Sequence, residues 1–300
     1  MLLAALAVIL VAALVTYMRV GTRQPAPPPV VPSSASATPI VSPAPSPGPS
    51  LPPAPALAQL QQEVRRLEVE RSVSLGVAIV PIGRAEEATL APWQSGTLTT
   101  TEAWSTMDVP IAIAVLRSDK QPEDLDYLFS RALLEGSSAG DDALWSFLGS
   151  DEVAAARTTA VLRDGGDSTT VVPVVSPRAG SSGHTQAIWS ASDQARFMAG
   201  AYCMPDAWPV LTKLGEMPPD RAWGLSRLPR AQAKGGTGVT VAGNEVVRQL
   251  GVVTLADGSK VGVSIIAAAL DGTALTATNA VDELADELPK MAIGLGTGHC

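Results

Sequence analysis

The distribution of apolar and polar residues divides the chain into three zones. Residues 2–18 form an apolar run that ends at Arg19. At a rise of about 1.5 Å per residue, this run spans about 26 Å, near the short limit for a membrane helix. No charged residue precedes it and no small-residue cleavage site is evident. We therefore expect an uncleaved transmembrane anchor over residues 1–23 rather than a signal peptide.

The second zone, residues 24–55, consists mostly of Pro, Ala, Ser and Val and carries no charge. Such a composition cannot bury a core and favours polyproline II, which extends about 3.1 Å per residue. About 30 residues would reach about 90 Å. A spacer that holds a domain away from a membrane and a linker without a length requirement both fit this composition.

The third zone, residues 56–300, has the pattern of a globular domain. Apolar residues at helical spacing predict a helix over 57–70. A predicted strand over 72–81 and its hairpin partner over 88–98 follow. A helix over 109–117 then opens a helical, loop-rich block that continues from 121 to 230.

Three further strands are predicted over 231–241, 246–255 and 260–269, and Asp257-Gly258 is a hairpin signal between the last two. A closing helix over 273–288 is expected to stop at Pro289. The element order predicts an α+β fold, with an antiparallel five-stranded sheet, flanking terminal helices and an inserted all-helical lobe.

Composition narrows the function classes. The 300 residues are 46% apolar and can bury a large core, while a net charge of -8 without a basic stripe argues against nucleic-acid binding. Two cysteines, Cys203 and Cys300, and two histidines, His184 and His299, are too few and too scattered for a zinc site. We expect no metal and no cofactor.

The two cysteines favour one disulfide if the chain is exported. Closing a loop of about 100 residues would contribute roughly 4–5 kcal/mol in the chain-entropy model. The alternative is a buried free Cys203 with a frayed Cys300. Export itself is opposed by Arg19 and Arg23, which follow the apolar run, under the positive-inside rule; a start codon assigned too far downstream would remove this conflict.

Three short motifs occur in order on a helix, a loop and a strand: Ser105-Thr106-Met107-Asp108, Ser137-Ser138-Ala139 and Lys234-Gly235-Gly236. They resemble the Ser-x-x-Lys, Ser-Asp-Asn and Lys-Thr-Gly motifs of the serine β-lactamase and penicillin-binding protein superfamily. The resemblance covers roughly residues 57–300. Residues 103–114 and 186–197, with the Lys-Gly-Gly motif, also resemble a group of secreted actinobacterial β-lactamase-like proteins.

The resemblance implies a β-lactamase/DD-peptidase-like fold with Ser105 as the nucleophile. It also implies that Ser137 and Lys234 complete the proton route, and that Lys234, Gly235 and Gly236 hold the substrate. In this family the lysine one helical turn after the serine supports deprotonation of its hydroxyl, and backbone N–H groups form the oxyanion hole.

The chain departs from these motifs at Asp108, Ser138 and Ala139. An ion pair at about 4 Å is worth roughly 4 kcal/mol at an effective dielectric of about 20, so replacing attraction by repulsion costs several tenfold factors in rate. Acylation is therefore expected to be impaired. A structural interpretation of Asp108 is also available, because a carboxylate before Val109-Pro110 can cap the helix that follows.

Other candidate residues have structural interpretations of their own. His184 could act as a substitute base near Ser105, but a loop histidine is more often a surface or hydrogen-bonding residue. Asp141 and Asp142 could act as paired carboxylates, although solvation at a helix start is the commoner role. Gly235–Gly238 lacks the Lys-Ser/Thr that a phosphate loop requires. Six tryptophans are expected to pack the lobes together or line the cleft: Trp93, Trp104, Trp145, Trp189, Trp208 and Trp223.

Three functions remain open. The leading hypothesis is a membrane-anchored, extracytoplasmic protein of the cell envelope that is catalytically inactive. It would bind a peptidoglycan-type ligand or an envelope protein partner. One alternative is an active serine hydrolase that uses Ser105 with Lys234 or His184 as a non-standard base. The other is a structural accessory subunit of a membrane complex.

Overall fold

The computed structural model describes residues 55–83, 91–240, 243–293, 295 and 298–300. The predicted anchor over residues 1–23, and the predicted linker up to residue 54, lie outside these ranges. Within the described ranges, no helix combines the length and apolar character needed to cross a membrane.

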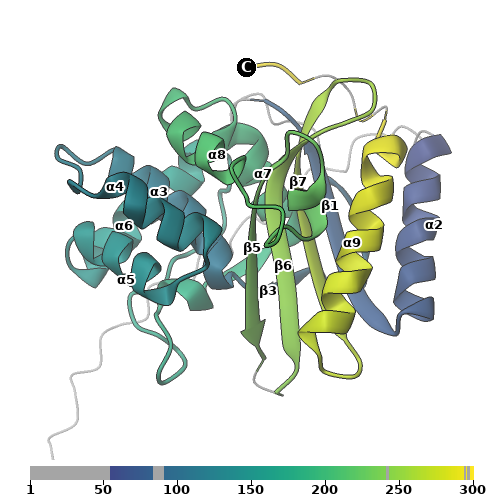
Figure 1. The fold of residues 1–300 in the computed structure, drawn as a ribbon, viewed down its shortest axis with the longest axis horizontal. Helices are drawn as coiled ribbons and strands as arrows, with labels where there is room; N and C mark the ends of the chain where they lie inside the picture. The colour runs from purple at the N-terminus through teal and green to yellow at the C-terminus, as the bar shows by residue number, and fades with distance from the viewer. Residues whose placement is uncertain (1–54, 84–90, 241–242, 294, 296–297) are drawn as a thin grey trace, which may run out of the picture. The chain divides into compact units, whose positions relative to one another are not determined.

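A five-stranded antiparallel sheet has the strand order β2-β1-β7-β6-β5 (Figure 1). The strands are β1 (Val73–Pro81), β2 (Trp93–Gly96), β5 (Gln232–Val239), β6 (Glu245–Thr254) and β7 (Lys260–Ala269). The N-terminal strand β1 pairs along its whole length with β7, with Val77 opposite Ile265. This pairing joins the two ends of the domain in one sheet and confirms the predicted antiparallel arrangement.

The turn between β6 and β7 follows the sequence signal. Gly258 has a φ of 86°, a conformation that glycine adopts without steric cost, and the Asp257 side chain accepts a hydrogen bond from the Ser259 N–H at 3.0 Å. The predicted hairpin over these residues is confirmed.

Two terminal helices, α2 (Pro55–Glu70) and α9 (Ala274–Met291), lie side by side on one face of the sheet (Figure 1). Leu60, Val64 and Leu67 of α2 are fully buried at helical spacing in a core that they share with the sheet. The predicted end of α9 at Pro289 is wrong, because the helix continues to Met291. Pro289 lies in the last turn, where its missing N–H removes only one helical hydrogen bond.

The opposite face of the sheet is covered by α7 (Ala191–Ala201), which packs on β1 and β7. Gly262 of β7 permits this close approach, since a Cβ there would lie 2.4 Å from the carbonyl oxygen of Ala195. The other α-helices of the inserted lobe are α3 (Asp108–Leu116), α4 (Leu125–Phe129), α5 (Ser138–Phe147), α6 (Asp151–Asp164) and α8 (Trp208–Leu214). Helix α3 is buried from Asp108 to Val115, so it forms the core of this lobe.

Shorter elements connect these helices. They are the 3₁₀ helices η2 (Trp104–Met107), η4 (His184–Gln186), η5 (Pro205–Ala207) and η6 (Gly224–Arg227), and the single π-turn η3 (Ser130–Leu134). A two-stranded ribbon of β3 (Thr100–Glu102) and β4 (Ile188–Ser190) was not predicted. Three-residue strands are too short to give a detectable period.

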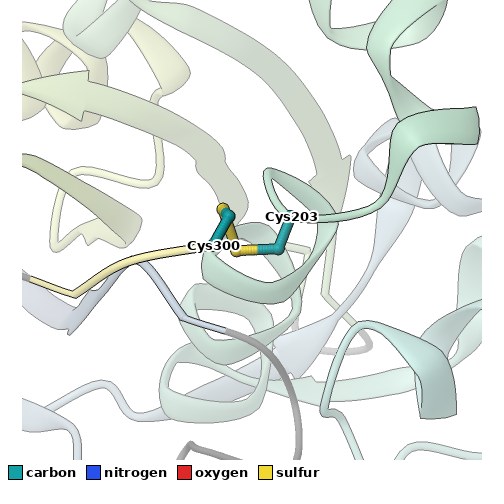
Figure 2. Close-up of a disulfide and its surroundings, with 2 residues drawn as sticks. All are labelled: Cys203 and Cys300. Atoms are coloured by element: carbon teal, nitrogen blue, oxygen red, sulfur yellow. A yellow bond between two sulfur atoms is a disulfide. The ribbon is translucent and has the colours of Figure 1, made fainter.

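Cys203, just after α7, forms a disulfide with the C-terminal residue Cys300 (Figure 2). The two Cα atoms are 5.1 Å apart, within the range that a disulfide spans. The expected pairing is confirmed over the alternative of two free thiols, and it ties the end of the chain to the helical lobe.

Candidate functional site

Ser105 lies on η2, which faces β5. A Cβ on Gly236 of β5 would lie 3.1 Å from the backbone nitrogen of Ser105, and one on Gly238 would overlap the Trp104 ring at 2.1 Å. Trp104 itself has a φ of 50°, which is uncommon for a residue with a side chain. The glycines of β5 therefore allow the strand to pack closely against the turn that presents Ser105.

The hydroxyl of Ser105 is half-buried and makes no hydrogen bond to any described residue. Ser137 is in a different position, because it is the N-cap of α5. Its hydroxyl oxygen accepts from the Gly140 N–H at 3.4 Å and from Arg131 Nη2 at 2.9 Å. Ser138 and Ala139 follow as exposed residues.

Lys234 lies on β5 with its side chain buried. Its Nζ is 3.1 Å from Asp108 Oδ2 and donates a hydrogen bond to the carbonyl oxygen of Ala132 at 2.8 Å. The structure thus brings Lys234 to Asp108, the residue that stands where the resembled Ser-x-x-Lys motif has a lysine. Within the described part of the chain, no hydrogen bond joins Lys234 to Ser105 or Ser137.

The prediction that Asp108 caps α3 is wrong, because Met107 is the N-cap residue and Asp108 Oδ1 has no hydrogen-bond partner among the described residues. Helix α3 continues directly from η2, and the Asp108 N–H already donates to the carbonyl oxygens of Ser105 and Thr106. The free N–H groups that a cap normally satisfies are therefore fewer here. The carboxyl group is used for the ion pair with Lys234 instead.

Asp141 of α5 is a further neighbour that acts on the Asp108 carboxyl group. The Oδ1 atoms of both residues are buried and have no hydrogen-bond partner among the described residues. Burial and the neighbouring Asp141 raise the pKa of Asp108 well above its usual range, although Lys234 acts in the opposite direction.

His184 completes this group. Its Nε2 lies 2.8 Å from Asp141 Oδ2, and its ring stacks on Trp145 with the centroids 4.3 Å apart. We call Lys234, Asp108, Asp141 and His184 the buried cluster, since their exposed fractions are 2%, 1%, 5% and 1%. Four elements contribute one residue each: β5, α3, α5 and η4.

The buried cluster changes two sequence interpretations. Solvation at a helix start was the favoured role for Asp141 and Asp142, but only Asp142 is exposed, and it accepts a hydrogen bond from Ser182 at 3.1 Å. His184 is a hydrogen-bonding residue, as its structural interpretation held, but it is buried rather than on the surface.

Arg178 was not singled out from the sequence. Its guanidinium lies 5.5 Å from the centre of the Trp104 ring, donates a hydrogen bond to the carbonyl oxygen of Val239, and is 3.9 Å from Glu102. Arg178 therefore fastens the loop before η4 to the end of β5, beside the turn that carries Ser105. An arginine in a loop carries no spacing signal that could have predicted this contact.

The predicted ligand-binding glycines have packing roles in the structure. A Cβ on Gly235 would lie 2.5 Å from the Trp223 ring, and Gly236 faces the backbone of Ser105. Contact with a ligand stays a prediction for both. Among the described residues, no group of three or more His, Cys, Asp or Glu side chains is arranged to hold a metal ion.

Neither a protein-family model nor a curated protein sequence matches the chain. Solved structures do. The TLA-3 extended-spectrum β-lactamase superposes with a TM-score of 0.60 at 12% identity and covers 79% of this chain and 99% of its own. A β-lactamase from Streptosporangium roseum gives 0.58 at 14% identity, with coverage of 80% and 100%. A variant of the reconstructed last common ancestor of Gram-negative class A β-lactamases gives 0.57 at 16% identity, with coverage of 78% and 98%.

The described part of the chain has a β-lactamase-like fold. At these identities the likeness concerns the fold alone, and it agrees with the predicted sheet, terminal helices and helical lobe. Within this β-lactamase-like fold, Ser105 and Lys234 lie on the turn before α3 and on β5, as the motif order predicted. Lys234 and Asp108, which is three residues after Ser105, belong to the buried cluster.

Proposed function

We propose that this chain is a β-lactamase-like binding protein of the cell envelope that holds its ligand or partner without acyl transfer. The observation that carries the proposal is the pairing of Lys234 with Asp108 at 3.1 Å, with the remaining contact of the ammonium group to the Ala132 carbonyl. This pairing leaves the hydroxyl of Ser105 without a bonded base among the described residues.

The chemistry of the buried cluster supports this proposal in either protonation state of Asp108. A serine hydroxyl is a weak nucleophile until a neighbouring base removes its proton. A protonated Asp108 is not a base, and an ionised Asp108 is held by the ammonium group of Lys234. The hydroxyl oxygen of Ser137 already accepts a hydrogen bond as the N-cap of α5.

The hydrolase alternative needs a base that can reach Ser105. His184 was the second candidate, and its Nε2 is bonded to Asp141 while its ring stacks on Trp145. Using His184 at Ser105 would require breaking both contacts. The structure therefore offers no specific observation in favour of the hydrolase.

Two features support a position outside the cytoplasm. The Cys203–Cys300 disulfide suits an oxidising compartment, and the apolar run with its proline-rich linker suits a domain held away from a membrane. We infer that the domain is presented on the outer side of the cytoplasmic membrane, where a peptidoglycan-type peptide or an envelope protein is within reach.

Covalent labelling tests the central claim. The full chain is incubated with a fluorescent penicillin or a fluorophosphonate, alongside Ser105→Ala and an active class A β-lactamase as the positive control. We expect no adduct on the chain and normal labelling of the control enzyme. An adduct that disappears in Ser105→Ala, followed by turnover, would overturn the proposal.

Binding and location need separate tests. Titration of an acylated D-alanyl-D-alanine peptide, followed by calorimetry, is expected to give the same affinity for the wild type and Ser105→Ala, with the peptide recovered intact. Protease added to whole cells is expected to cut within residues 24–55. Cutting only after cell lysis would contradict the external location.

A further inference from the structure

A second site adjoins His184 and is separate from Ser105. A pocket of about 430 Å³ is formed between α5, the start of α6 and the loop before η4, and its lining includes none of Ser105, Ser137 and Lys234. This volume is within the range of small-molecule sites. We call it the His184 pocket.

The acceptor side of the His184 pocket follows from the buried cluster. His184 Nε2 lies 2.8 Å from Asp141 Oδ2, and a carboxylate oxygen is an acceptor. His184 Nε2 therefore donates to it. In the neutral imidazole the other nitrogen, Nδ1, carries the lone pair.

The second ring nitrogen of His184, Nδ1, is available to the pocket. It has no hydrogen-bond partner among the described residues. It is also absent from their buried polar atoms without a partner, so solvent can reach it. His184 lines the pocket although the residue as a whole is only 1% exposed. A buried histidine thus presents one acceptor atom to the cavity.

Two carboxylates complete the polar lining. Asp142 uses one oxygen for Ser182, and Asp151 uses one for the Trp145 indole N–H at 2.7 Å. The second oxygen of each makes no hydrogen bond to a described residue. Among the residues that the structure describes, no lysine or arginine lines the pocket, so these charges are not neutralised from within it.

We propose that the His184 pocket binds a small primary ammonium ion that also carries hydroxyl groups. The ammonium group would donate to Asp142, Asp151 or His184 Nδ1, all of which are acceptors. Serine hydroxyls in the lining, at positions such as 146 and 181, match the hydroxyls of the ligand, and Val174 and Val175 at the pocket contact its carbon chain. A carboxylate or phosphate ligand would meet two negative charges and is disfavoured.

The test uses a matched pair of probes, D-glucamine and sorbitol, which differ in an ammonium group and a hydroxyl. Calorimetry with the full chain at neutral pH is expected to show saturable binding of D-glucamine and at least tenfold weaker binding of sorbitol. The variant Asp142→Asn/Asp151→Asn is expected to lose at least tenfold in affinity for D-glucamine. Asparagine keeps an oxygen for Ser182 and for Trp145, so the local hydrogen bonds can persist.

The control variant Asp119→Asn/Asp220→Asn removes the same charge from exposed positions outside this pocket and should bind as the wild type does. A ¹⁵N NMR spectrum of the free protein above neutral pH is expected to show the Nε2-protonated tautomer of His184. The opposite tautomer, equal affinity for sorbitol, unchanged affinity in the pocket variant, or no saturation up to about 50 mM D-glucamine would each overturn the inference. None of these readouts depends on whether Ser105 reacts with a penicillin.

Discussion

Asp108 shows how a residue that looks like a lost catalytic group becomes part of a buried network. On sequence alone its charge predicts repulsion at the reaction centre, and the structure instead sets it against Lys234. Burying either charge without its partner costs several kcal/mol, so each residue offsets the cost of burying the other. The two residues are 126 positions apart, and no local pattern could have predicted their contact.

A double-mutant cycle on Asp108 and Lys234 tests this interdependence. Asp108→Ala leaves a buried ammonium group without its counter-charge, and we expect the free energy of unfolding to fall by about 3–5 kcal/mol. Lys234→Met should also be destabilising. The double variant should cost less than the sum of the two, measured by urea unfolding. Additive losses would contradict the pairing.

The raised pKa of Asp108 predicts that stability depends on pH. The raised pKa of Asp108 means that the folded state keeps a proton that the unfolded state releases in the ordinary carboxyl range. Stability is therefore complete below that range and falls as the pH rises toward the raised pKa, by about 1.4 kcal/mol for each unit of difference.

Asp108→Asn removes this titration. Urea unfolding between about pH 5 and pH 9 should show the wild type losing stability relative to this variant as the pH rises. The exposed variant Asp220→Asn should follow the wild-type curve. Parallel curves for wild type and Asp108→Asn would contradict a raised pKa of Asp108.

At the scale of elements, periodicity predicted the long helices and strands well because each has one buried face. Helix α2 and strands β6 and β7 lie within two residues of their predicted bounds. The ribbon of β3 and β4 escaped prediction, because it is fixed by a distant side chain. Arg248 of β6 is fully buried and donates to the carbonyl oxygens of Thr101, Glu102 and Trp189, which belong to that ribbon.

Arg248 is therefore predicted to hold the ribbon and α7 to the sheet. Burial lowers the pKa of its guanidinium to about 9, and Gln194 of α7 accepts another of its hydrogen bonds at 2.9 Å. Arg248→Met leaves several buried acceptors without a donor, and each unsatisfied acceptor costs about 1–3 kcal/mol. We therefore expect the free energy of unfolding to fall by at least about 3 kcal/mol.

Hydrogen exchange should localise the effect of Arg248→Met, with faster exchange in residues 100–102 and 188–190 than in β1 and β7. Arg221→Met is the matched control, because Arg221 is exposed and its side chain makes no hydrogen bond or ion pair to a described residue. A loss below about 1 kcal/mol for Arg248→Met would mean that the ribbon is held by its own backbone pairing.

At the scale of the whole molecule, the sequence predicted the architecture better than the site. Element order and three short motifs were enough to predict the β-lactamase-like fold, because they depend on local spacing. The buried cluster depends on which side chains meet across β5, α3, α5 and η4. Spacing along the chain carries no information on such contacts, so Asp141 was expected to be solvated, the partner of His184 was not predicted, and Arg178 was given no role.

The disulfide is the one long-range contact that residue counting predicted, because the chain has only two cysteines. It closes a loop over a separation of 97 residues and fixes the C-terminus beside the end of α7 (Figure 2). In the chain-entropy model a loop of this size stabilises by roughly 4–5 kcal/mol, and measured values are commonly about 2–4 kcal/mol.

The variant Cys203→Ser/Cys300→Ser should therefore lose about 2–4 kcal/mol in urea unfolding, and the reduced wild type should lose the same amount. Counting thiols in the protein purified from the cell envelope should give none until it is unfolded and reduced. The single variant Cys300→Ser separates the cross-link from packing at Cys203, because it leaves the partly buried sulfur in place. If the constraint on the unfolded chain is what stabilises the fold, Cys300→Ser should lose as much unfolding free energy as the double variant. Equal stability of Cys300→Ser and the wild type would show that the C-terminal cross-link contributes nothing.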